Sequence, residues 1–174
     1  GRTSAAAMFV GEQPGDREDL EGHPFVGPAG QVLDRALREA GIDRTEAYVT
    51  NAVKHFKHVP RGKRRMHQKP NQGEIEACRW WLSLELRFVR PKLVVALGAS
   101  AGQALFRRRV AIGRERGRPF PFEDAMLPEA EVQGFLTAHP SYVLRQRDGE
   151  AREREFALLV RDLRRVASII RAEG

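Results

Sequence analysis

Short apolar segments alternate along the chain with longer segments in which apolar residues recur every three or four positions. The short segments are Ala5–Val10, Ala47–Val53, Leu93–Leu97 and Gly134–Ala138. Because they are brief and contain β-branched or aromatic residues, they predict buried strands. The periodic segments predict helices over Ala29–Ala40, Glu74–Val89, Ser100–Phe106 and Glu150–Ala172. The first of these helices should end at Gly41.

The alternation of strands and helices predicts an α/β fold. Such strands form a mostly parallel sheet, here of four strands, with helices on both faces, which gives a three-layer αβα architecture. A sheet of this kind binds its ligand at the carboxyl ends of the strands, so the loops that follow the strands are the informative ones. The segment from Lys54 to Gln72 is the longest without apolar periodicity, and we expect a functional or disordered loop there.

Length and composition narrow the classes of protein. A chain of 174 residues predicts a single domain spanning residues 1–174. No apolar run approaches the about 18 residues of a membrane span, and the first residues carry no signal-peptide pattern. The single cysteine, Cys78, excludes an intrachain disulfide and fits a reducing, cytoplasmic location. We therefore expect neither a secreted protein nor a membrane protein.

The charge balance favours a polyanionic partner. The chain has 30 Lys and Arg against 23 Asp and Glu, a formal net charge of +7. Nucleic acid is favoured over a membrane surface because the sequence contains no separate basic amphipathic helix that could bind a membrane. Most of these cations are arginines, however, and a GC-rich coding sequence produces the same excess. Charge alone therefore leaves the partner open.

Two motifs lie between the first predicted strand and the first predicted helix. The turn Gly11–Gly15 (GEQPG) can bring backbone amides close to a ligand, with Glu12 and Gln13 projecting from it, or it is an acidic surface turn. It lacks the glycine spacing and the Lys-Ser/Thr pair of a phosphate loop. Phe25 stands between prolines and glycines before a helix, where it either stacks on a flat ligand or fills the core.

Two polar residues mark the ends of later strands. Asn51 interrupts the second apolar segment, and its amide either bonds the backbone or faces the edge of a base. His139 follows the fourth segment, and it is either a satisfied core histidine or a donor to a departing anion.

A basic loop follows the second predicted strand. Its five cations either bind the phosphates of a nucleic acid or form a basic surface exposed to solvent. They are Arg61, Lys63, Arg64, Arg65 and Lys69. His67 lies inside this cluster, where neighbouring cations favour a neutral, nucleophilic imidazole. All the motifs fall at the carboxyl ends of predicted strands, so we expect them to form one site.

Together these motifs resemble the uracil-DNA glycosylase superfamily, specifically its iron–sulfur branch, family 4. The resemblance runs nearly end to end, and its motifs are Gly11–Gly15 (GEQPG), Pro24–Gly30 (PFVGPAG), Thr50–Lys54 (TNAVK), Leu97–Gly98 and His139–Ser141 (HPS). The loop Lys63–His67 (KRRMH) resembles the KRRIH loop that separates the UdgX proteins from the hydrolytic family 4 enzymes. Met66 replaces isoleucine in that loop, a nearly volume-conserving change.

The resemblance implies a protein that flips deoxyuridine out of single- or double-stranded DNA, releases uracil, and then bonds covalently to C1′ of the abasic sugar. By motif, His67 is the nucleophile, and Glu12 stabilises the cationic sugar and orients His67. His139 would hydrogen-bond the uracil O2 as charge builds on the leaving base. The alternatives are an ordinary hydrolytic family 4 enzyme and a DNA-binding module without catalysis.

The same matching assigns the binding residues. Asn51 would read the uracil edge, Phe25 would stack on its face, and Gln13 would complete the uracil site and help to position the sugar. The residues expected to hold the DNA backbone are Arg61, Lys63, Arg64, Arg65, Lys69, Ser141 and Arg145. We expect a monomer.

Family 4 also implies a 4Fe–4S cluster bound by four cysteines, two of them in an N-terminal C-x-x-C. His55 and Cys78 match the two later ligand positions, with histidine in place of cysteine at 55. We expect both to be ligands in the intact protein, whose cluster-binding N-terminal segment would be missing from this chain. Otherwise Cys78 is a core residue on an apolar helical stripe and His55 an ordinary loop residue.

Overall fold

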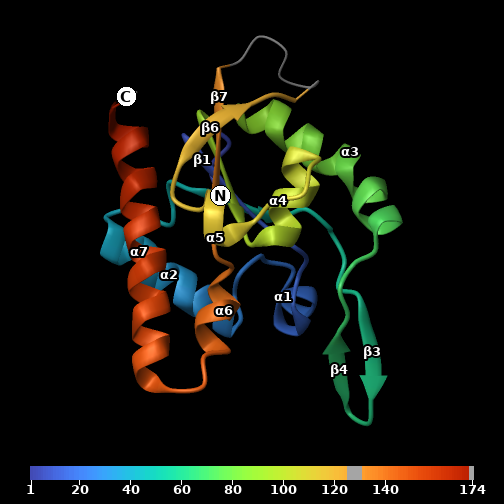
Figure 1. The fold of residues 1–174 in the computed structure, drawn as a ribbon. Helices are drawn as coiled ribbons and strands as arrows, with labels where there is room; N and C mark the ends of the chain where they lie inside the picture. Colours follow the sequence, from blue (N-terminus) through green and yellow to red (C-terminus); the bar gives the residue numbers. More distant parts are fainter. Residues whose placement is uncertain (125–130, 173–174) are drawn as a thin grey trace.

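A five-stranded sheet lies at the centre of the computed structural model, which describes residues 1–124 and 131–172 (Figure 1). The spatial order of the strands is β2-β1-β5-β7-β6. Their bounds are β1 Ala7–Gly11, β2 Tyr48–Asn51, β5 Leu93–Leu97, β6 Pro119–Phe122 and β7 Val132–Thr137. The pairs β2–β1, β1–β5 and β5–β7 are parallel, which confirms the mostly parallel sheet expected from the sequence.

The sheet has five strands and not the four expected, because β6 pairs antiparallel with β7 at one edge. Two of the four residues of β6 are prolines, Pro119 and Pro121. Proline cannot donate to a ladder and is tolerated at a sheet edge, so this strand carries no ordinary strand pattern. The other strands lie within two residues of their predicted bounds, and β5 matches them in full.

Seven helices surround the sheet within the described residues. They are α1 Asp16–Glu21, α2 Pro28–Ala40, α3 Gln72–Val89, α4 Ala99–Phe106, α5 Ile112–Glu115, α6 Pro140–Leu144 and α7 Gly149–Ala172. The predicted helices correspond to α2, α3, α4 and α7, and Gly41 ends α2 in the left-handed conformation, as predicted. Asn71 and Glu74 form a capping box that fixes the start of α3.

Alternate side chains of the buried strands enter two cores, one on each face of the sheet. Phe9 and Val95 pack with α2 and α7, whereas Met8 and Val94 pack with α3 and α4. All five residues of β5 are buried. The three-layer αβα class expected from the sequence is therefore confirmed.

The segment predicted as a loop over Lys54–Gln72 instead contains a β-hairpin. Strands β3 His58–Arg61 and β4 Arg64–His67 pair antiparallel, with His58 opposite His67, and they form a sheet of their own. Gly62 turns the chain between them with a φ of +60°. The hairpin projects from the body of the protein at the lower right of Figure 1.

Within the described residues, no helix combines the length and the apolar character that a membrane crossing requires.

Candidate active site

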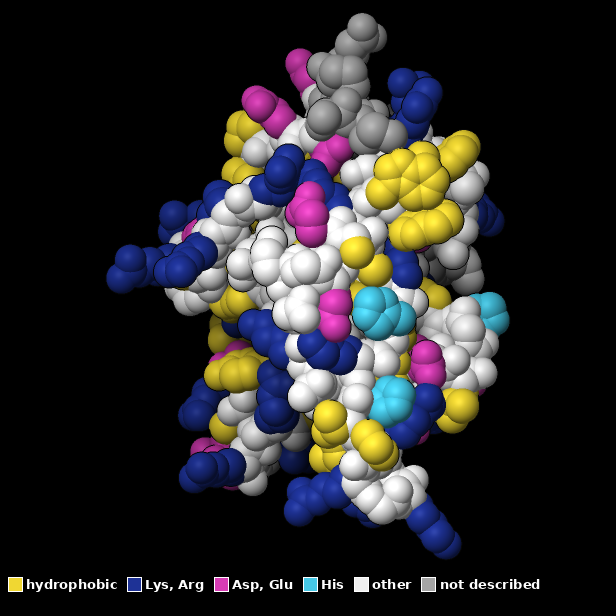
Figure 2. All heavy atoms as spheres, turned by 90° about the vertical axis from the view of Figure 1, so that its right-hand side faces the viewer, with side chains coloured by type: hydrophobic (Ala, Val, Ile, Leu, Met, Phe, Trp, Pro, Cys, Tyr) yellow, Lys and Arg dark blue, Asp and Glu magenta, His cyan; other side chains and the backbone are white. Residues whose placement is uncertain are grey.

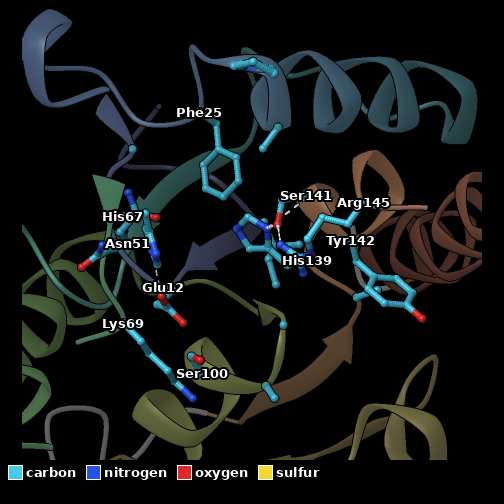
Figure 3. A pocket seen from close by; sticks show the side chains of 18 of the residues that line it. Glu12, Phe25, Asn51, His67, Lys69, Ser100, His139, Ser141, Tyr142 and Arg145 are labelled. Carbon is cyan, nitrogen blue, oxygen red and sulfur yellow. Dashed lines mark hydrogen bonds and ion pairs between the residues drawn. The ribbon is translucent and has the colours of Figure 1, made fainter. Parts of the chain in front are cut away.

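A cavity of about 1040 Å³ opens at the carboxyl ends of the strands. Residues from every predicted motif line it, namely Glu12, Gln13, Phe25, Asn51, His67, Lys69, His139, Ser141 and Arg145. Figure 3 shows Glu12, Asn51 and His67 on one wall, with His139, Ser141 and Arg145 on the other. The expectation that these motifs meet in one place is therefore confirmed.

Asn51 ends β2 at the wall of this cavity and carries a buried acceptor without a hydrogen-bond partner among the described residues. The residue is 5% exposed, and its Oδ1 has no hydrogen-bond partner within the described part of the chain. A buried acceptor without a partner destabilises the protein unless a ligand supplies the donor. Gly11 on the neighbouring strand makes room for it, because a Cβ at position 11 would lie 2.4 Å from Asn51 Oδ1.

Phe25 is held in the cavity in a backbone conformation that is unfavourable for its residue type. Its φ is +56°, and its side chain is buried. Gly30 permits this conformation, because a Cβ there would lie 1.9 Å from the Phe25 carbonyl oxygen. The ring lies 5.8 Å from the His139 ring, centre to centre. Backbone strain of this kind concentrates at binding sites, and here it holds an aromatic face toward the cavity.

His139 is the N-cap of α6, and its hydrogen bonds fix its tautomer. The backbone N–H of Ser141 donates to His139 Nδ1 at 3.1 Å, and the Ser141 hydroxyl lies 2.8 Å from the same nitrogen. Arg145 donates to that hydroxyl at 2.8 Å. Because Nδ1 accepts from a backbone amide, a neutral ring carries its proton on Nε2.

Burial lowers the pKa of His139 to about 4, with smaller contributions from the nearby Arg145 and His67. The ring is therefore neutral at physiological pH, with Nε2–H as its free donor. This donor can bond a carbonyl oxygen that gains negative charge without first giving up a proton.

His67, at the end of β4, lies beside Glu12. The distance from His67 Nε2 to Glu12 Oε1 is 3.3 Å, and the two side chains are 53% and 21% exposed. In a neutral imidazole, one nitrogen donates a proton and the other keeps a lone pair. A carboxylate that accepts from the first nitrogen leaves the second free to act as a nucleophile.

Gln13 is 8% exposed and uses its amide to hold the hairpin. Its Nε2 donates to the carbonyl oxygens of Lys57 and Gln68, at 3.2 and 3.1 Å, and its Oε1 accepts from the Lys57 amide. These bonds fasten the two ends of the segment that carries His67. Gln13 therefore has a structural role, and because it also lines the cavity, its contact with uracil stays a prediction.

Arg65 is also occupied within the protein. Its guanidinium forms ion pairs with Asp16 and, at 2.6 Å, with Asp19, and it lies over the Phe56 ring. These contacts tie β4 to the first turn of α1, two positions away from His67. Arg65 therefore anchors the hairpin, and its expected contact with DNA stays a prediction.

The remaining cations of the basic loop divide into two groups. Arg61, Lys63 and Arg64 are exposed at the tip of the hairpin, outside the cavity lining, and Lys and Arg side chains project there at the bottom of Figure 2. Lys69 lines the cavity, as does Arg145 from α6. The basic residues therefore extend from the cavity to the hairpin tip.

His55 and Cys78, the two candidate cluster ligands, are neighbours. Cys78 Sγ lies 3.8 Å from His55 Nδ1 and also accepts from the Lys54 amide at 3.5 Å. The described residues contain no group of three or more His, Cys, Asp or Glu side chains arranged for a metal ion. Because a 4Fe–4S cluster needs four ligands, the residues present do not fit a complete cluster site.

Several residues of this region were not foreseen from the sequence. Asp16 and Asp19 were not assigned a role in the sequence, although both pair with Arg65 in the structure. Two carboxylates at positions i and i+3 directly after a motif could have indicated a site for a cation. Arg116 reaches the cavity wall from the end of α5, where it donates to buried Asp162 at 2.8 Å. Tyr142 stands at the rim of the cavity, and only its adjacency to the HPS motif indicated it.

Comparisons with known proteins agree with this geometry. A family model described as the uracil DNA glycosylase superfamily matches residues 1–164. A type-4 uracil-DNA glycosylase of Thermotoga maritima is 35% identical over 100% of this chain and 82% of its own length. A type-4 uracil-DNA glycosylase of Pyrobaculum aerophilum is 33% identical over 84% of this chain and 71% of its own. One from Archaeoglobus fulgidus is 35% identical, with coverages of 83% and 69%.

Proposed function

The chain belongs to the uracil-DNA glycosylase superfamily, and on that basis we propose that it excises uracil from DNA and then captures the abasic sugar on His67. The excision follows from the type-4 relatives together with the cavity. The capture is a finer proposal, carried by one observation: His67 Nε2 lies 3.3 Å from Glu12 Oε1 at the wall of that cavity.

Recognition of uracil would use the polar and aromatic groups already aimed into the cavity. The free Oδ1 of Asn51 accepts from uracil N3–H, and the amide nitrogen of the same side chain donates to O4. Phe25 stacks on the base. The base enters by flipping out of the strand, a step that costs a few kcal/mol in duplex DNA and less in single-stranded DNA.

Cleavage would depend on His139 and Glu12. As the bond between C1′ and N1 breaks, its electron pair moves to the uracil ring, and Nε2–H of His139 donates to O2. The sugar becomes an oxocarbenium ion, which the Glu12 carboxylate stabilises. The base leaves as the uracil anion, which takes up a proton from water as it reaches the solvent and becomes free uracil.

Capture would complete the reaction. The lone pair of the His67 nitrogen that does not face Glu12 attacks C1′ and forms a C–N bond. The imidazole then gives up the proton on its other nitrogen to Glu12, so the charge on the ring is removed. Because an imidazole bonded to carbon is a poor leaving group, the protein would act once.

Cations on either side of His67 would hold the DNA backbone. Lys69 and Arg145 line the cavity, where they can contact the phosphates beside the flipped nucleotide. Arg61, Lys63 and Arg64 at the hairpin tip can contact the strand farther away. We route none of these steps through the iron–sulfur cluster that family 4 implies, because the described residues do not form a complete site for it.

An ordinary hydrolytic glycosylase is the second candidate, and the three type-4 relatives favour it. In that case a water molecule, not His67, would attack C1′, and the protein would turn over. The amount of uracil released per protein molecule separates the two candidates, since capture limits it to one.

The decisive experiment mixes the protein with a uracil-containing oligonucleotide and separates the products on a denaturing gel. We expect an adduct that survives denaturation. His67→Ser should abolish the adduct while uracil release persists. His58→Ser is the matched control, because His58 lies opposite His67 on the same hairpin and should leave the adduct unchanged.

Other results would remove parts of the proposal. An adduct that persists in His67→Ser would exclude His67 as the nucleophile. Free abasic product over many turnovers would support the hydrolytic reading. Salt-dependent binding with no preference for uracil over thymine, and no uracil release, would leave only a DNA-binding module.

A further inference from the structure

Helix α3 carries apolar side chains on two faces, and only one of these faces packs against the sheet. Leu82, Leu86 and Val89 belong to the buried face. A second set lies toward solvent at the three- and four-residue spacing of one helix face. This set, which we call the α3 stripe, consists of Ala77, Trp81, Leu84 and Phe88, with Trp80 beside them.

The α3 stripe is an exposed aromatic surface. Trp80, Trp81 and Phe88 are 58%, 55% and 72% exposed, and the two indole rings pack edge to face at 4.7 Å between their centres. Figure 2 faces the side of the molecule where α3 lies and shows hydrophobic side chains gathered at its upper right. None of the described residues that line the cavity comes from α3. Because a cluster of large apolar residues in solvent is typical of an interaction site, the α3 stripe calls for a partner.

The order of the residues makes the α3 stripe complementary to itself. If two copies of α3 pack antiparallel about a twofold axis between positions 82 and 83, Ala77 of each copy lies opposite Phe88 of the other. In the same arrangement Trp81 lies opposite Leu84. Each aromatic ring therefore meets a smaller side chain, which leaves room for it. A parallel arrangement would instead set ring against ring and leave a gap between the two alanines.

The charges beside the α3 stripe favour the same arrangement. Glu76 and Arg87 are exposed on the side of the stripe where Trp80 lies, and neither has an ion-pair partner within the described residues. Equivalent flanks meet in an antiparallel helix pair, so Glu76 of each copy would lie beside Arg87 of the other. These two pairs would offset part of the repulsion between two chains that each carry a net charge of +7.

The area of the α3 stripe suits a reversible contact between two copies. An aromatic side chain can bury about 150–250 Å², and more than half of each of the three is exposed. Six rings from two copies would bury roughly 600–900 Å², and the flanking residues would bring the interface to about 1,200 Å², where stable interfaces begin.

We propose that the α3 stripe is the docking surface for a second copy of this chain, which forms a reversible antiparallel dimer. The hairpin precedes α3 in the chain, so the two hairpins would lie at opposite ends of the helix pair. The α3 stripe and the cavity share no described residue. The dimer departs from the monomer expected from the sequence, and it does not depend on the proposed excision of uracil.

The test measures sedimentation velocity over a series of protein concentrations. The sedimentation coefficient of the unaltered protein should rise with concentration toward that of a dimer. Trp81→Ala should raise the dissociation constant about thirtyfold or more, the loss expected for a tryptophan at the centre of an interface. Leu20→Ala is the matched control, because Leu20 is exposed on α1, outside the stripe, and should leave the constant unchanged. Circular dichroism verifies that each variant is folded.

An exchange of charges tests the antiparallel arrangement itself. Glu76→Arg and Arg87→Glu should each weaken the dimer, because like charges would then meet on the flank of the stripe. The double variant should associate as the unaltered protein does, and it has the same net charge. Weakening in both single variants without recovery in the double variant would overturn the arrangement.

Other outcomes would overturn the dimer. A protein that sediments as a monomer at every concentration would do so, as would a Trp81→Ala variant that associates as tightly as the unaltered protein. If the protein is monomeric and Trp81→Ala weakens its binding to single-stranded DNA, the α3 stripe is a nucleic-acid surface instead. A protein that dimerises through α3 but releases no uracil would refute the proposed function and support this inference.

Discussion

Arg65 on the hairpin and Asp16 on α1 form an ion pair that joins two segments 49 residues apart in the sequence. Asp16 directly follows the turn that carries Glu12, and Arg65 precedes His67 by two residues. The ion pair therefore connects the hairpin, which carries the proposed nucleophile His67, with the turn that carries its carboxylate partner Glu12. Its function would be to hold His67 within reach of C1′.

Loss of this link should impair capture more than excision. In Arg65→Gln we expect adduct formation to slow by roughly ten- to a hundredfold, because a small displacement of a reacting group costs that much. Uracil release should change little, since Asn51, Phe25 and His139 do not depend on the hairpin. Single-turnover gels that resolve free oligonucleotide, abasic product and adduct measure both rates. Arg64→Gln, at an exposed position beside it, should leave the ratio of adduct to released uracil unaltered.

Gly11 should be intolerant of any side chain. In Gly11→Ala the new Cβ would lie 2.4 Å from Asn51 Oδ1 and 2.7 Å from Phe25 Cζ, so both proposed uracil contacts would be displaced. Uracil excision should fall by roughly a hundredfold. The matched control is Gly149→Ala, where no heavy atom lies within 4 Å of the new Cβ. Uracil release rates and circular dichroism would measure activity and fold, and equal loss of activity in both variants would refute the argument.

The titration of His139 offers a test that requires no substrate. Burial, then Arg145 and His67, lower its pKa to about 4 in the folded protein. The fold favours the neutral ring, so the stability it contributes is full above the ordinary histidine pKa of about 6.5 and declines as the pH falls toward 4. Ring NMR shifts, assigned with His139→Gln, should show an Nε2–H tautomer and a midpoint near pH 4.

Arg145→Gln should raise that pKa only part of the way, because burial is the larger cause. Arg147→Gln, another exposed cation nearby in sequence, should not move it. A midpoint close to pH 6.5 in the unaltered protein would mean that His139 is not held as a neutral donor.

Asp162 should be the most sensitive carboxylate for stability. It is 2% exposed and accepts from Thr137 Oγ1 at 2.7 Å and from Arg116 Nε at 2.8 Å. In Asp162→Ala the Arg116 guanidinium would remain buried without this partner, so we expect a loss of about 3–5 kcal/mol. Urea denaturation measures it. Asp34→Ala, which removes an exposed ion pair with Arg44, should cost less than about 1 kcal/mol.

The sequence predicted those parts of the fold that rest on burial. Strand β5 is apolar along its whole length because both of its faces are covered. The hairpin was missed because its residues are exposed or only partly buried, so no alternation of apolar and polar residues marks it. Strand β6 was missed because two prolines interrupt it.

The candidate site was predictable as a gathering of motifs but not as a set of contacts. Parallel strands bring their carboxyl ends to one edge, which places Glu12, Asn51 and His139 together whatever the detailed packing. The partners of Arg65 and the amide bonds of Gln13 depend on how the hairpin folds back over α1. Such long-range pairings have no local signature in a single sequence.

The two strands of the hairpin share no ladder with the five-stranded sheet. Exchange of residues 58–67 for a short connection would therefore spare the scaffold and the groups that face the base. If His67 captures the abasic sugar, the hairpin alone decides whether the abasic strand is released or stays covalently bound. Replacement of the hairpin alone would then convert a single-turnover protein of this fold into an enzyme that turns over.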